Sequence, residues 1–127
     1  MADIVKKQLI LIVENSKACQ QYYAQELHHY ATIQQATTIE EGSRLVADYF
    51  DNKVILILDG TLSHHLYALA ILRIAKEIAT KKQFTPIIVS GSSTEKDNEK
   101  LILSGCTYNA KNKKEVVPIV KKILEAL

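Results

Sequence analysis

The stretch Val54–Gly60, which reads VILILDG, decides the fold that the sequence predicts. Its five apolar residues follow one another without interruption, which is typical of a strand buried on both faces in the middle of a parallel sheet. An aspartate and a glycine come directly after this apolar run. Because open α/β sheets bind their ligands at the carboxyl ends of the strands, Asp59 is predicted to lie at a binding edge.

Four further strands are predicted from short apolar or β-forming runs, at residues 8–13, 31–35, 86–89 and 107–110. Amphipathic helical segments alternate with them, starting after the capping side chains Ser16 and Thr38 and then covering residues 66–79, 94–103 and the stretch that ends at Leu127. Right-handed crossovers place such helices on both faces of a parallel sheet. The sequence therefore predicts a doubly wound α/β fold, with a five-stranded parallel sheet in the flavodoxin-like order 2-1-3-4-5.

The helical segments carry apolar and aromatic residues three and four positions apart, which is the period of one helix face. The face predicted to pack in the first segment contains Cys19, Tyr22, Tyr23, Leu27 and Tyr30. The corresponding face of the second segment contains Leu45, Val46, Tyr49 and Phe50.

Size and composition indicate one domain covering residues 1–127. A hydrophobic fraction of 47% in 127 residues is enough for a core, and a net charge of +2 is too small to indicate a nucleic-acid partner. The two cysteines, Cys19 and Cys106, form no CxxC pair, which favours a reducing compartment over a disulfide framework. The N-terminus lacks the apolar core of a signal peptide, and no apolar run approaches the about 20 residues that span a bilayer. We expect a cytoplasmic protein with no membrane contact and no direct nucleic-acid contact.

Polar side chains follow four of the predicted strands at the point where each strand ends. They are Glu14 and Asn15, Asp59, Ser90, and Lys111. The predicted strand order brings these ends side by side. Carboxylate and amide oxygens suit a hard divalent cation such as Mg²⁺, and a hydroxyl with an ammonium group suits phosphoryl oxygens. An aspartate in such a place can act as a nucleophile and form an acyl phosphate.

In the order, spacing and local context of these residues, the chain resembles a response-regulator receiver domain of the chemotaxis-regulator type, from about residue 8 to Leu127. The resemblance implies Asp59 as the phosphoryl acceptor, Ser90 as a switch hydroxyl, and Lys111 as the lysine paired with Asp59 or its phosphate. It also implies Tyr108 as an aromatic switch coupled to Ser90. The magnesium site that it implies consists of Glu14, Asn15, Asp59 and the backbone carbonyl of Thr61.

The chain departs from the pattern of this family at several positions, and two of these departures bear directly on the predicted site. The second member of the family's acid pair is usually a carboxylate, whereas here it is Asn15, so the metal site has one negative charge fewer. Lys111 is followed by Asn112 rather than by the usual proline, so no cis peptide bond is expected there. The first departure opens an alternative function, a pseudo-receiver that acts as a phosphorylation-independent protein-interaction module.

The resemblance implies a phosphoprotein of two-component signalling or a phosphorelay, a stand-alone response regulator rather than an enzyme. The phosphoryl group would come from a histidine kinase or a phosphotransfer protein. A downstream effector protein would bind the face formed by residues 94–103, 107–110 and the last helix. The formation of a homodimer is a further possibility that the resemblance leaves open. A flavodoxin-like nucleotide or flavin site is disfavoured, because residues 14–17 lack a glycine-rich or Ser/Thr-rich phosphate cradle.

Overall fold

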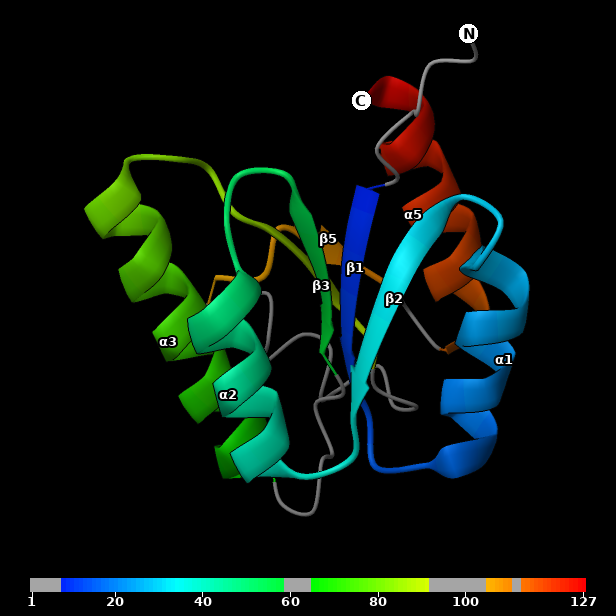
Figure 1. The fold of residues 1–127 in the computed structure, drawn as a ribbon, viewed down its shortest axis with the longest axis horizontal. Helices are drawn as coiled ribbons and strands as arrows, with labels where there is room; N and C mark the ends of the chain where they lie inside the picture. The colour runs from blue at the N-terminus through cyan, green and yellow to red at the C-terminus, as the bar shows by residue number, and fades with distance from the viewer. Residues whose placement is uncertain (1–7, 59–64, 92–104, 111–112) are drawn as a thin grey trace, which may run out of the picture.

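A central sheet lies between two layers of helices in the computed structural model of the chain, which describes residues 8–58, 65–91, 105–110 and 113–127 (Figure 1). The strands are β1 (Gln8–Val13), β2 (Ala31–Ala36), β3 (Val54–Leu58), β4 (Ile87–Ser90) and β5 (Tyr108–Asn109). All neighbouring strands are parallel, and their order is β2-β1-β3-β4-β5. The predicted α/β class and strand order are therefore confirmed.

The last strand is shorter than the sequence predicts, with two residues instead of the four at 107–110. At each of its ends a hydroxyl takes part in the pairing with β4. The Thr107 hydroxyl accepts from the N–H of Ile88 at 3.2 Å, and the Ser90 hydroxyl accepts from the N–H of Ala110 at 3.3 Å. These side-chain bonds stand beside a backbone bond from the N–H of Thr107 to the carbonyl of Ile88 at 2.9 Å, so hydroxyl groups extend the pairing beyond the two residues of β5.

Four helices are described: α1 (Lys17–Leu27), α2 (Ile39–Tyr49), α3 (His65–Lys82) and α5 (Lys113–Ala126). The helices α2 and α3 cover one face of the sheet, and α1 and α5 cover the other (Figure 1). The predicted caps are confirmed, since Ser16 Oγ accepts from the N–H of Cys19 and Thr38 Oγ1 from the N–H of Glu41, each at 3.2 Å. The helix predicted at 94–103 lies outside the described residues.

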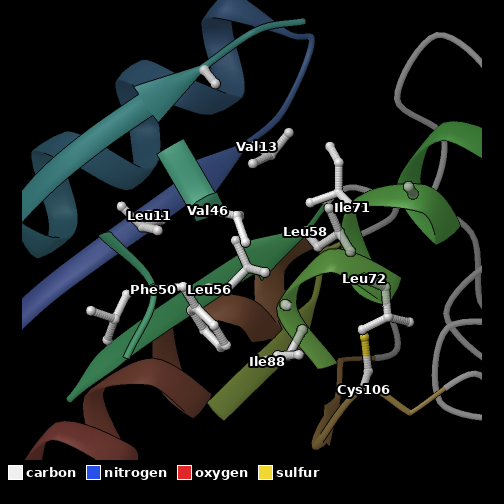
Figure 2. Close-up of a cluster of buried hydrophobic side chains, with 14 residues drawn as sticks. Leu11, Val13, Val46, Phe50, Leu56, Leu58, Ile71, Leu72, Ile88 and Cys106 are labelled. Carbon is white, nitrogen blue, oxygen red and sulfur yellow. The ribbon is translucent and has the colours of Figure 1, made fainter. Parts of the chain in front are cut away.

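The core consists of two clusters, one on each face of the sheet. Figure 2 shows the cluster under α2 and α3, which includes Leu56 and Leu58 of β3. Ile55 and Ile57 of the same strand point into the other cluster, under α1 and α5. Every residue of β3 is buried, as its unbroken apolar sequence predicts.

The prediction of which residues of α1 and α2 pack against the sheet is only partly correct. Tyr23 of α1 is buried, whereas Tyr22, Tyr30 and Tyr49 keep 43%, 52% and 47% of their surface exposed. A tyrosine at a position of the apolar helix face can pack part of its ring and still keep its hydroxyl in water. Tyr30, just beyond α1, also lies under the ammonium group of Lys121 of α5, which is 5.4 Å from the ring centroid.

Within the ranges that the structure covers, no helix combines the length and apolar character needed to cross a membrane. Neither cysteine takes part in a disulfide; Cys19 is half-buried and Cys106 is buried.

Candidate functional site

The register of the sheet aligns three strand ends. Leu58, the last residue of β3, pairs with Val13 of β1 on one side and with Ser90 of β4 on the other. Glu14 comes directly after Val13 in the chain, and Asp59 directly after Leu58. The order and register therefore bring Glu14 and Ser90 to the same edge, on either side of the end of β3.

Glu14 is an acidic residue in a buried place, with only 1% of its surface exposed. Its N–H donates to the carbonyl of Ala36 at 3.0 Å, and its carbonyl accepts from the side-chain amide of Gln20 at 3.0 Å. A carboxylate in such surroundings is stable only with a cation or several hydrogen-bond donors beside it. The main chain of Glu14 is thus fixed to β2 and to α1.

Asn15, the second member of the atypical pair, is exposed to solvent. It is followed by Ser16, the residue that caps α1. The loop therefore offers one buried carboxylate and one accessible amide. Both carry oxygen atoms, the ligands that Mg²⁺ prefers, so this donor set fits a hard cation. The set carries one negative charge fewer than a pair of carboxylates would.

Ser90 is fully buried, with an exposure of 0%, and its hydroxyl accepts from the N–H of Ala110, the residue after β5. The next residue, Gly91, donates its N–H to the carbonyl of Leu58 at 2.8 Å. A Cβ atom on Gly91 would lie 3.2 Å from Cγ2 of Ile57 and 3.6 Å from the hydroxyl oxygen of Tyr23. The end of β4 is therefore closely packed against β3 and α1.

Tyr108 lies on β5, paired with Val89, the neighbour of Ser90. Its side chain is 38% exposed. Ser90 and Tyr108 therefore lie on neighbouring strands, one residue apart in register. The predicted coupling between these two residues stays a prediction.

Three of the predicted site residues, Asp59, Thr61 and Lys111, lie outside the described residues. Across the ranges that are described, no group of three or more His, Cys, Asp or Glu side chains is gathered around a possible metal position. Glu14 and Asn15 are the predicted metal ligands whose surroundings the structure does describe.

The sequence interpretation missed that two residues of α1 border this site. It did not name Gln20, and it placed Tyr23 on the packing face without assigning a role to its hydroxyl. Gln20 is 6% exposed, and Tyr23 brings its hydroxyl close to Gly91. The positions 20, 23 and 27 lie on one helix face, three and four residues apart, and Leu27 is buried as well. This spacing was the signal that would have identified Gln20 as a buried amide.

Solved structures with a similar fold include receiver domains. One is a CheY-like response regulator receiver domain protein from Methanospirillum hungatei, with 21% identity, a TM-score of 0.68, and coverage of 94% of this chain and 95% of that one. A CheY-like receiver domain from Methylobacillus flagellatus has 16% identity, a TM-score of 0.70, and coverage of 92% and 98%. The BeF3-activated receiver domain of DrrB has 21% identity, a TM-score of 0.67, and coverage of 94% and 98%.

No family model and no curated protein sequence matches the chain. The likeness therefore establishes the fold, that of a CheY-like receiver domain, and the predicted resemblance is confirmed at this level.

Proposed function

We propose that the chain is a response-regulator receiver that accepts a phosphoryl group on Asp59. The observation that carries this proposal is the pair of buried polar side chains, Glu14 and Ser90, at the strand ends on either side of the end of β3. Burying a carboxylate and a hydroxyl at a strand edge has an energetic cost that a purely structural domain avoids. Ligand sites of parallel sheets lie at this edge.

In the proposed reaction, a carboxylate oxygen of Asp59 attacks the phosphorus of a phosphohistidine on a histidine kinase or a phosphotransfer protein. The phosphorus–nitrogen bond breaks, the imidazole leaves and takes up a proton, and an acyl phosphate forms on Asp59. Bound Mg²⁺ supplies positive charge for the phosphoryl oxygens. Glu14, Asn15 and Asp59, with the carbonyl of Thr61, would hold the ion, and Lys111 would contact the phosphoryl group.

Ser90 connects this site to β5 in the proposal. Its hydroxyl oxygen accepts the N–H of Ala110, so a turn of the side chain toward a phosphoryl oxygen would weaken that bond. The pairing of β5 would then adjust, together with the exposed ring of Tyr108. An effector protein that binds β5 and α5 would detect the change.

A second candidate function is a pseudo-receiver, a protein-interaction module that works without phosphorylation. The observation that favours it is Asn15, a neutral and exposed side chain beside the buried carboxylate of Glu14. One carboxylate fewer lowers the affinity of the site for Mg²⁺, on which formation of the acyl phosphate depends.

Intact mass spectrometry after incubation with Mg²⁺ and acetyl phosphate distinguishes the two functions. The receiver predicts one added phosphoryl mass that is absent in Asp59→Asn. An adduct that appears only in Asn15→Asp would place the defect at the metal site and support the pseudo-receiver. Folded protein that gains no phosphoryl group in any form, from acetyl phosphate or from a panel of phosphohistidine donors, contradicts the receiver.

A further inference from the structure

Gln20 makes an unusual set of contacts at the strand ends for a residue of α1. Its side-chain nitrogen lies 2.9 Å from the carbonyl oxygen of Ala36, 3.0 Å from that of Glu14 and 3.3 Å from that of Ile12. These oxygens belong to the last residue of β2 and to the end of β1. One amide group therefore joins two strands and the helix that follows.

The orientation of this amide is determined by its surroundings. Three carbonyl oxygens surround one end of the side chain, and an amide oxygen placed there would face three acceptors without a hydrogen atom between them. The NH₂ group has two hydrogen atoms, which the two shorter contacts, to Ala36 and Glu14, use. The other end, Oε1, is buried and has no hydrogen-bond partner among the described residues.

This imbalance indicates that Gln20 is present for its donor end. An apolar side chain of similar size would avoid burying Oε1, so packing alone does not favour an amide here. What the donor end contributes is a bond to the main chain of Glu14, whose own N–H is already held by Ala36. Both backbone groups of Glu14 are thus fixed.

We propose that Gln20 is a positioning residue for the candidate phosphoryl site, one that acts through Glu14. It sets the direction in which the buried carboxylate and the neighbouring Asn15 face a cation. This inference rests on the proposed receiver function, in which these two side chains hold Mg²⁺. It does not make Gln20 a ligand, because its side-chain amide is engaged with backbone carbonyls.

The test compares Gln20→Met with Gln35→Met by NMR. Methionine has a similar size and cannot donate. Gln35 is the matched control, since its side chain donates to the main-chain carbonyl of Gln20 at 2.8 Å but does not contact the Glu14 loop in any described bond. In Gln20→Met we expect the Glu14 amide to exchange about tenfold faster, with amides of β3 unchanged. The dissociation constant for Mg²⁺ is expected to rise about 10–100-fold.

Gln35→Met is expected to change neither quantity. Unchanged exchange at Glu14 in folded Gln20→Met overturns the positioning role, and so does an equal effect of the two substitutions. If the native chain binds no Mg²⁺, the magnesium site of the proposed function fails, and the exchange rate at Glu14 alone then decides the role of Gln20. The two failures are therefore distinguishable.

A measurement on the native chain covers the case in which Gln20→Met does not fold. The side-chain amide protons of Gln20 are expected to exchange at least about tenfold more slowly than those of Gln21, which is exposed. Equal exchange at the two side chains overturns the proposal without any substitution.

Discussion

The ends of β1 and β4 both bury a polar side chain, but the sheet holds the two ends differently. β1 pairs with β2 along all six of its residues, and Glu14 beyond it is fixed through both of its backbone groups. β4 meets β5, which has two residues, and Ser90 contacts it through a hydroxyl bond of 3.3 Å. Backbone bonds hold both halves of the edge, but between β4 and β5 they are few, and two side-chain hydroxyls add to them.

This difference assigns two tasks to two regions. A group that binds a cation needs a constant position, which the extended pairing of β1 supplies. A group that signals needs two arrangements of similar energy, and a short strand with few backbone bonds is suited to that. In the proposed receiver, the β1 half binds and the β4–β5 half responds.

The largest expected effect comes from truncating the core of the β1 half. Ile12 of β1 is fully buried, and Ile12→Ala should lower the free energy of unfolding by about 2–5 kcal/mol, because a cavity remains. Ile87 of β4 is half-buried, so Ile87→Ala should lower it by about half as much. Urea denaturation followed by circular dichroism measures both, and equal losses would contradict the comparison.

A smaller effect is expected at Thr107, in the β4–β5 half. Its hydroxyl donates to the carbonyl of Pro86 at 2.6 Å and accepts from the N–H of Ile88 at 3.2 Å. Thr107→Val keeps the shape and removes both bonds, at about 1–2 kcal/mol. Hydrogen exchange should accelerate at Ile88 and not at Ile12. Thr107→Ser is the control that keeps the hydroxyl. Faster exchange at both Ile88 and Ile12 in Thr107→Val would show that the β1 half and the β4–β5 half do not respond separately.

The smallest effect is confined to alkaline pH and distinguishes the two cysteines. Burial raises the pKa of Cys106, next to β5, from 9.0 to about 12, and the nearby charge of Lys76 opposes this shift. The unfolded chain loses this proton first, so the contribution of the thiol to stability is complete below pH 9.0 and declines as the pH rises toward about 12.

At about pH 9.5 this loss should be on the order of 1 kcal/mol, measured as the difference between the native chain and Cys106→Ala. The Sγ atom of Cys106 points toward Leu72 in the core (Figure 2). Iodoacetamide should therefore label the half-buried Cys19 well before Cys106. Equal labelling rates in folded protein would mean that the β5 end opens more often than its packing indicates.

Much of the fold was predictable because its determinants are local. The apolar run of β3 specifies a strand buried on both faces, and Ser16 and Thr38 specify where α1 and α2 begin. For the site, the sequence predicted a polar edge, and the described part of it contains Glu14 and Ser90 in buried positions. Their chemical roles stay predictions.

Residues whose environment depends on distant partners were not predictable in the same way. Tyr22 and Tyr23 are adjacent aromatic residues with the same propensities, yet one is 43% exposed and the other 1%. Which of them is buried depends on the angle at which α1 lies on the sheet. The hydroxyl ends of β5 were not foreseen either, because they involve residues about twenty positions apart.

The sequence by itself determined the alternation of strands and helices, the buried centre of the sheet and the polar character of its carboxyl edge. These follow from hydrophobic period, capping and strand ends, which act over a few neighbouring residues. Only the tertiary structure decided that Gln20 faces three carbonyl oxygens and that Ser90 and Val13, the residue before Glu14, share the register of Leu58. Such placements arise when separate elements pack together, because each buried polar group must then find its partner across the chain.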